Sequence, residues 1–318
     1  MKRLSVAAVF LAASVTAASA QTPPVDDVEA NTVEALVVTA RQPGPAWWRV
    51  SDADSTVYVL GMPDALPKGQ KWDQSVLQRR LKGANRVITS PVVQAGASPL
   101  AVPKLLIDMK KATGSKTALD AGATPEMRAR LAAAAKRAGK TSAAYQSMRP
   151  WYAGLKLSEH YRKAVGLDYG EPHGAVRKAV KKSKVKAAPA MVVEMKAATL
   201  LKDLRSMPEA AGRACLEDAI EEVEAGDALV RRAGQAWAVG DVKGALQMRR
   251  SSERCMAMVP GAGDFKRQAM TKQADAIEAA LKQPGHSVAV LSIRSLVARE
   301  GVLEKLRARG HQIRTPAE

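Results

Sequence analysis

Two short strand-like runs of apolar residues stand near the start of the main domain. They cover residues 47–50 and 56–60, and the polar residues 51–55 separate them. This arrangement predicts a β-hairpin. We expect the second strand to end at Gly61, because glycine lets the backbone turn sharply. The side chains that follow would then lie at the carboxyl edge of a sheet, where α/β proteins commonly build their sites.

The rest of the chain alternates between helical and strand-like patterns. Apolar residues at helical spacing predict helices over residues 72–83, 98–112, 124–139, 153–165 and most of 197–254. Apolar runs predict strands over residues 86–90 and 286–293, and a last helix and strand over 301–310 and 311–315. We therefore predict an α/β domain over residues 46–315: a central mixed sheet flanked by helices, with a largely helical middle region at about residues 150–282.

The N-terminus has the pattern of a secretory signal peptide. Lys2 and Arg3 precede an apolar stretch, and Ala18-Ser19-Ala20 supplies small residues for cleavage after Ala20. The apolar stretch is too short for a stable membrane span, and no other segment is long and apolar enough. We expect an exported, periplasmic protein with no transmembrane segment in its mature chain.

Residues 21–45 contain prolines and charged residues and predict a disordered linker. Within it, the β-prone residues 32–41 resemble the TonB box at the start of many TonB-dependent outer-membrane receptors. Such a segment binds by adding a strand to a partner's exposed sheet edge. The candidate partner contacts are Val33, Leu36, Val37 and Val38. Alternatively, the segment pairs as an edge strand of its own domain or stays loose.

The chain is strongly basic. Its formal net charge is +18, and removal of Lys2 and Arg3 with the leader lowers it to +16. The densest basic run, residues 177–186, lacks the interleaved aromatic residues that stack on bases, and an exported protein rarely meets nucleic acid. We expect no nucleic-acid partner and favour a solvated face for this run. If it binds a partner, anionic envelope polymers or lipid headgroups are the nearest candidates.

Cys215 and Cys255 are the only two cysteines. In an exported chain such a pair predicts a disulfide, which would close a loop of about 40 residues and stabilise the fold by about 4 kcal/mol. A redox or nucleophilic thiol is the alternative, but no histidine neighbours either cysteine in the sequence.

Other candidate chemistry is sparse. His160 and His173 lack the paired spacing of metal ligands, and we interpret both as surface or capping residues. A cluster of acidic residues predicts a solvated helix face that balances nearby arginines: Glu217, Asp218, Glu221, Glu222 and Glu224.

Several motifs together resemble the TraB/GumN family, relatives of the Tiki metalloproteases. The hairpin is followed by Gly61, Leu66-Pro67 and Trp72, as in the first family motif. Met148-Arg-Pro-Trp-Tyr152 resembles its Met-Lys-Pro-Trp element, and Trp237-Ala-Val-Gly-Asp241 resembles its Trp-x-x-Gly-Asp turn. The resemblance runs over residues 46–315. It implies an α/β fold and hydrolysis of peptides by a divalent metal that histidines and carboxylates hold.

The family's site residues are not kept. Asp64 stands where the first Gly-x-x-His has its histidine, and Arg294, or Ser295 if the loop is shifted by one, stands at the second. Ser90 replaces a strand-end glutamate, and Glu194 is the candidate remnant of a later one. A guanidinium repels a metal ion, so we predict neither a metal site nor a cofactor, and no confident catalytic residue. We expect Asp64 and Arg294 to form a salt bridge across the old site.

Three functions follow from this reading. The leading one is a catalytically inactive family member that serves as a periplasmic binding or envelope-associated module. The second is a metal-dependent hydrolase or peptidase with a rearranged site that uses Asp64 and a histidine from elsewhere in the chain, with Glu194 as a further candidate. The third is an accessory factor of the TonB system that works through residues 33–41. The sequence identifies no substrate and no oligomeric state.

Overall fold

The computed structural model describes residues 25–96, 99–168 and 171–318. The predicted signal peptide and its cleavage point therefore lie outside the described residues. None of the helices in the described ranges combines the length and the apolar character that a membrane span requires.

A six-stranded mixed sheet forms the centre of the domain, in the order β10-β1-β2-β9-β4-β7. Its strands are β1 Trp47–Ser51, β2 Ser55–Met62, β4 Val87–Thr89, β7 Ala187–Pro189, β9 Gly285–Ser292 and β10 Gln312–Arg314. β1 and β2 pair antiparallel as the predicted hairpin, and β9 pairs parallel with both β2 and β4. The α/β class and the central mixed sheet are confirmed.

The sequence led us to expect that the second strand ends at Gly61, and this prediction is wrong. β2 continues to Met62, and Gly61 is instead a point of close packing. A Cβ atom at Gly61 would lie 2.8 Å from the Trp48 ring and 3.0 Å from the Ile293 side chain. The Gly61 carbonyl also accepts a 2.8 Å hydrogen bond from Trp237 Nε1. Glycine is required here because there is no room for a side chain.

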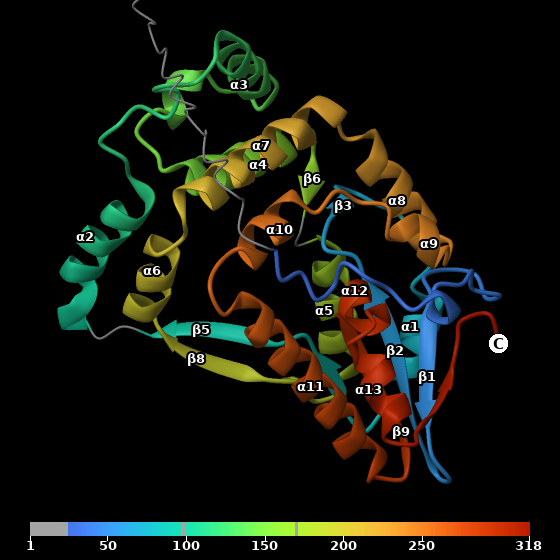
Figure 1. Cartoon of the computed structure of the whole chain (residues 1–318). Helices are drawn as coiled ribbons and strands as arrows, with labels where there is room; N and C mark the ends of the chain where they lie inside the picture. The colour runs from blue at the N-terminus through green and yellow to red at the C-terminus, as the bar shows by residue number, and fades with distance from the viewer. Residues whose placement is uncertain (1–24, 97–98, 169–170) are drawn as a thin grey trace, which may run out of the picture.

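Helices cover both faces of the sheet (Figure 1). On one face lie α11 Ala262–Leu281, α12 Ile293–Val297 and α13 Val302–Ala308. On the other lie α1 Ser75–Leu81 and α5 Glu171–Ser183. Fully buried residues such as Val57, Leu77 and Leu291 link these layers into one apolar core. The core explains why a continuous apolar run such as β9 becomes a central strand.

The middle region is largely helical, as predicted. It contains α4 Pro150–Ala164, α7 Glu209–Ala225, α8 Ala228–Ala238, α9 Val242–Ala245 and α10 Ser251–Ala257, and α3 Pro125–Arg137 precedes it. Its own apolar cluster, with Leu157 and Ile220 fully buried, joins α3, α4 and α7. Thr124 caps α3 by accepting a 3.1 Å hydrogen bond from the backbone N–H of Met127.

The remaining elements are short or peripheral. β3 Leu66–Pro67 pairs with β6 Leu167–Asp168, and β5 Val92–Gly96 pairs with β8 Val192–Lys196. The β5–β8 ladder leads to α2 Val102–Thr113 and α6 Ala197–Arg205, which lie side by side away from the central sheet (Figure 1). Single 3₁₀ turns occur at Glu34–Leu36, Pro99–Ala101 and Ser142–Tyr145.

Residues 25–45 are not a disordered linker, so that prediction is wrong for the described part of the segment. Leu36 is fully buried in the main core. The backbone N–H of Val33 donates to the Val297 carbonyl at 2.8 Å, and that of Ala40 donates to the Gly240 carbonyl at 2.9 Å. Gly240 has φ +79°, and a Cβ there would lie 2.5 Å from the Ala40 Cβ, so only glycine admits this approach.

Candidate functional site

The site predicted from the sequence lies at the carboxyl edge of the central sheet. β2 and β9 are parallel neighbours whose last residues, Met62 and Ser292, stand opposite each other. Asp64 follows β2 by two residues, and Arg294 lies in the first turn of α12 directly after β9. The Ser292 hydroxyl donates to Asp64 Oδ1 at 3.3 Å. The chain thus brings Asp64 and the end of β9 together, as the family resemblance implies.

The predicted salt bridge between Asp64 and Arg294 is absent. Within the described residues no ion pair of 4.0 Å or less joins them. Arg294 is buried and its Nη2 donates to the Leu246 carbonyl, in the loop after α9. The guanidinium therefore bonds a carbonyl at the C-terminal end of a helix, where backbone acceptors lack partners within the helix. Its positive charge also favours a lower pKa of Asp64 without a direct contact.

The other predicted site positions are not part of this contact. Ser90 directly follows β4 at the same edge of the sheet, but no hydrogen bond from it is found within the described residues. Glu194 lies on β8, in register with Gln94 of β5, and thus in a different sheet. The second-glutamate prediction for Glu194 finds no support in this placement.

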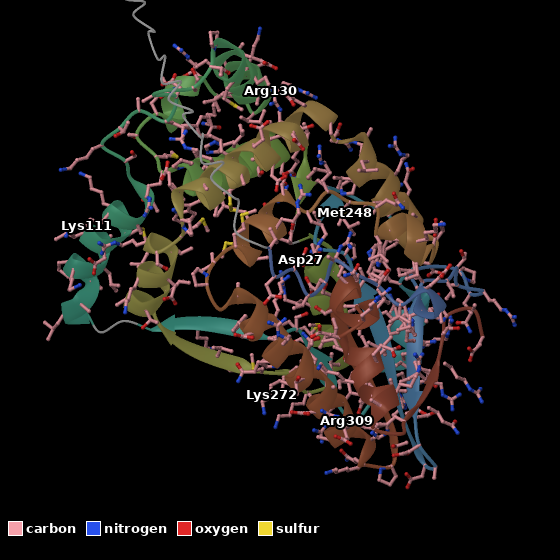
Figure 2. The ribbon with its side chains drawn as sticks, viewed as in Figure 1. Asp27, Lys111, Arg130, Met248, Lys272 and Arg309 are labelled. Atoms are coloured by element: carbon pink, nitrogen blue, oxygen red, sulfur yellow. A yellow bond between two sulfur atoms is a disulfide. The ribbon has the colours of Figure 1, made fainter. Side chains whose placement is uncertain are left out.

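Two acidic residues of the N-terminal segment, Glu29 and Asp27, also lie here, and no sequence motif marks them. Glu29 is buried and accepts a 2.6 Å hydrogen bond from the Ser295 hydroxyl. It also pairs with Arg250 Nη2 at 3.2 Å and with Lys266. Asp27 holds the same guanidinium with two bonds of 2.5 and 2.9 Å, and it lies toward the centre of the molecule in Figure 2. We call Glu29, Asp64, Arg250, Ser292 and Arg294 the edge site.

Opposing charges act on the titratable groups of the edge site. Burial, followed by the negative charges of Glu253 and Glu29, raises the pKa of the Asp64 carboxyl to about 6. Arg294 and Lys266 act in the opposite direction. Burial also lowers the pKa of the Arg294 guanidinium, and the neighbouring Arg250 adds to that effect. A carboxyl that titrates near neutral pH is typical of functional sites, although structural ion networks also produce it.

The space beside Asp64 is almost filled. A cavity of about 10 Å³ remains between Asp64, Arg250 and Glu253, about the room for one water molecule. Its far wall contains Glu222, which is buried and accepts hydrogen bonds from Arg162 Nε at 2.6 Å and from the Ser158 hydroxyl at 2.9 Å.

The residues present do not fit a divalent metal. Within the described ranges, no three His, Cys, Asp or Glu side chains are grouped so that they could hold one. The carboxylate of Glu29 is taken up by two cations and a hydroxyl, and Arg294 and Arg250 place fixed positive charge beside Asp64. A metal site needs deprotonated ligands that are free to bind the ion.

The described histidines lie away from the edge site. His160 is partly buried on α4, and its Nδ1 lies 2.9 Å from the Tyr145 hydroxyl, so it is not a simple surface residue. Burial, followed by Lys156 and Lys140, lowers the pKa of His160. His286 bonds the Arg80 carbonyl, and His311 lies beside Glu278. The side chain of His173 lies outside the described part of the structure.

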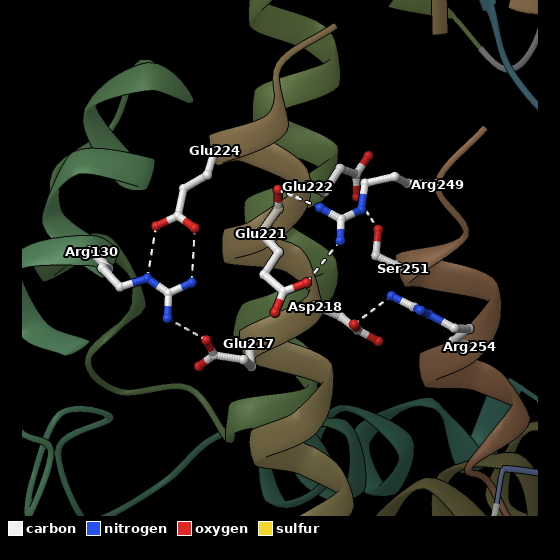
Figure 3. Close-up of polar contacts among 9 residues, drawn as sticks. All are labelled: Arg130, Glu217, Asp218, Glu221, Glu222, Glu224, Arg249, Ser251 and Arg254. Atoms are coloured by element: carbon white, nitrogen blue, oxygen red, sulfur yellow. Dashed lines mark hydrogen bonds and ion pairs between the residues drawn. The ribbon is translucent and has the colours of Figure 1, made fainter. Parts of the chain in front are cut away.

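The acidic residues of α7 pair with arginines, as the sequence predicts (Figure 3). Arg130 Nε lies 2.8 Å from Glu224 and the same guanidinium bonds Glu217, while Arg249 pairs with Glu221 at 2.8 Å. Asp218 pairs with Arg254. The exception is Glu222, which is buried rather than solvated and joins the network beside the edge site.

The two cysteines lie on two helices that carry this network, α7 and α10. Cys215 of α7 and Cys255 of α10 lie at disulfide distance, with their Cα atoms 4.9 Å apart, and both are buried. The bond would hold α10, and with it Arg250 and Arg254, against α7.

The partner segment predicted from the TonB resemblance is not free. Leu36 is fully buried, Val33 and Val37 pack against the core, and the Val38 carbonyl accepts a backbone hydrogen bond from Val242 at 3.3 Å. The expectation that these residues stand apart from their own domain is therefore wrong.

One signal in the sequence pointed to the missed residues. Asp26, Asp27 and Glu29 form an acidic cluster in a chain of net charge +18, directly before an apolar stretch. In the structure Asp26 also pairs with Arg267, at 2.6 and 3.0 Å. An acidic cluster in a basic chain is a candidate for docking onto the chain's own arginines.

Comparison with known proteins identifies a family. The sequence model of the TraB/PrgY/gumN family matches residues 46–315. No curated protein and no solved structure gives a match. The matched range covers β2, β9 and all of the helical middle region, but not Glu29. The chain therefore belongs to the TraB/PrgY/gumN family.

Proposed function

We propose that this family member has lost metal-dependent hydrolysis and acts as a non-catalytic binding module. The observation that carries the proposal is the state of the edge site. Arg294 and Arg250 stand beside Asp64, Glu29 is occupied by cations, and only about 10 Å³ remains open. Metal-assisted hydrolysis needs an open coordination position and a water that the metal activates.

Metal titration of the mature protein tests this proposal. We expect isothermal titration with Mn²⁺, Co²⁺ or Zn²⁺ to show no stoichiometric site that depends on Asp64, and a fluorogenic peptide assay to show no turnover. The matched control is the Asp64→Ala variant. One equivalent of metal bound at micromolar or tighter affinity, lost in Asp64→Ala and accompanied by peptide cleavage, would contradict the proposal.

One observation favours a second candidate, an enzyme with a rearranged site. The pKa of Asp64 is raised to about 6, a range suited to general acid–base work. Against it, Glu194 lies in the β5–β8 ladder and the space at Asp64 is nearly filled. This candidate requires that the purified protein has an activity and that Asp64→Ala abolishes it while leaving the thermal unfolding midpoint within a few degrees.

We also propose that the mature chain begins after Ala20 and works in the periplasm. The leader pattern supports export, and a cysteine pair at disulfide distance suits an oxidising compartment. Intact-mass analysis of the periplasmic fraction should find the chain without residues 1–20. A role in the TonB system would require residues 33–41 to leave the core that now holds Leu36.

A further inference from the structure

A wide groove lies between α1 and α5, on the face of the sheet opposite α11 and α13. Its volume is about 960 Å³, at the upper end of the range for ligand pockets. Its cations are Lys68, Lys82, Arg177, Lys178 and Lys182. Gln74, which precedes α1, and Gln78 of α1 add amide groups, and none of the described residues that line the groove is acidic. We call this cavity the α1/α5 groove.

The sequence of α5 explains why its cations gather on one side. Val176 and Val180, one turn apart, are buried against the main core. Lys178 and Lys182, also one turn apart, project from the opposite side of the helix into the groove. The basic run that the sequence analysis assigned to a solvated face is therefore the polar face of an amphipathic helix that forms one wall of a cavity.

The groove cations have no acidic partners among the described residues. Within those ranges no side-chain hydrogen bond and no ion pair is found for Lys68, Lys82, Arg177, Lys178 or Lys182. Several arginines elsewhere in the described structure are paired with acidic residues. Arg130, Arg249, Arg250, Arg254 and Arg267 each hold at least one carboxylate. Acidic residues neutralise the α7, α10 and α11 side of the molecule and leave the groove with unbalanced positive charge, which concentrates anions there.

The spread of the charges indicates the kind of anion. The cations come from three parts of the chain, before α1, after α1 and along α5, so they do not converge on one small ion. A second cavity of about 490 Å³ shares Gln74 and Ala175 with the groove and adds Lys71. Two adjoining cavities with basic lining suit a ligand that carries several anionic groups, and Lys and Arg are the usual partners of phosphate.

We propose that the α1/α5 groove binds a ligand with two or more phosphate groups. This deepens the proposed function, because it supplies the binding site that a non-catalytic module requires. The two ideas are tested separately. Metal titration reports on Asp64, whereas the groove lies on α1 and α5 and contains none of the edge-site residues. Failure of one leaves the other standing.

The test compares two triple variants that remove the same charge. The groove variant is Arg177→Gln, Lys178→Gln, Lys182→Gln, and the control is Lys116→Gln, Lys136→Gln, Lys140→Gln, whose residues are exposed and lie on or near α3. Inorganic tripolyphosphate and orthophosphate are the probes in isothermal titration, at an ionic strength where the Debye length is about 8 Å. Equal far-UV circular dichroism and thermal midpoints establish that both variants fold.

We expect tripolyphosphate to bind the wild-type chain saturably and more tightly than orthophosphate. The groove variant should bind about tenfold more weakly or worse, and the control should stay within about twofold of the wild type. Co-sedimentation with phosphatidylcholine vesicles, with and without phosphatidylglycerol, then identifies the source. Binding to anionic vesicles that the groove variant loses indicates a lipid headgroup, and no vesicle binding indicates a free phosphorylated ligand. Equal loss in both triple variants, or no saturable binding of either probe, would overturn the proposal.

Discussion

The buried carboxylate of Glu29 provides the sharpest test of the edge site. In the variant Glu29→Ala, Ser295 loses its acceptor, and Arg250 and Lys266 lose a negative partner. Breaking a buried ion pair costs about 3–5 kcal/mol. Arg250 keeps both bonds to Asp27, and the Lys266 side chain is 31% exposed and can turn to water. We therefore expect a cost at the lower end of this range, a loss of about 3 kcal/mol in the free energy of unfolding.

Thermal unfolding followed by circular dichroism measures this loss. For a chain of this size about 1 kcal/mol corresponds to about 2 °C, so the midpoint should fall by about 6 °C. The matched control is Glu300→Ala, because Glu300 is exposed and no hydrogen bond or ion pair involves it in the described structure. That variant should stay within about 1 °C of the wild type. Equal midpoints for the two variants would refute the docking of residues 25–45 over the edge site.

Three further predictions concern the disulfide, the titration of the site and a glycine. Replacing Cys215 and Cys255 together with alanine should lower the free energy of unfolding by about 4 kcal/mol, and a reducing agent should then have no added effect in urea unfolding. Because the folded pKa of Asp64 is about 6, above the value of 3.8 for a free aspartate, the folded state binds the extra proton and its stability falls as pH rises from about 4 to about 6. Asp64→Asn removes this pH dependence of stability. Between pH 4 and pH 7.5 the free energy of unfolding of the variant, relative to that of the wild type, should therefore rise by up to about 3 kcal/mol. A difference between the two proteins that does not change with pH would contradict the burial of this carboxyl. Gly240→Ala should destabilise by clearly more than Gly122→Ala, since both glycines have positive φ but only Gly240 faces a neighbouring side chain at 2.5 Å. The Gly122 variant should lose only about 1–2 kcal/mol of stability, which is the cost of backbone strain. Equal losses in the two variants would argue against the close approach at Gly240.

The fold was largely predictable because its central strands are marked by local patterns. The hairpin has two apolar runs around a polar turn, and β9 is a continuous apolar run whose residues 288–291 are all buried. Strands buried on both faces need such runs. β5 was missed, since its pairing depends on β8, about 100 residues away. The ends of parallel neighbours meet at one edge of a sheet, which explains why Asp64 lies beside Ser292 at the end of β9.

The rest of the site depends on contacts that no local pattern records. Residues 25–45 have the composition of a linker, and their order comes from partners far along the chain: Glu29 and Arg250 are separated by 221 positions. Arg294 has a strong candidate partner in Asp64, yet its guanidinium meets the Leu246 carbonyl at the end of a short helix. Opposite charges in a sequence identify candidate ion pairs, but they do not show which backbone carbonyls compete for the same donor.

The pairing of β2 with β9 also constrains how the protein acquires its structure. The two strands begin 230 positions apart (285 − 55), and each borders the other along its whole length. Closing so long a loop is entropically costly before the contacts repay it, so non-local pairing of this kind slows folding. A nascent chain that has not yet reached β9 lacks the middle of its sheet, although helices such as α4 and α7 can already associate. The polypeptide would thus remain without its main core until its last few dozen residues have been synthesised, which leaves a long interval in which it is open to chaperones and proteases.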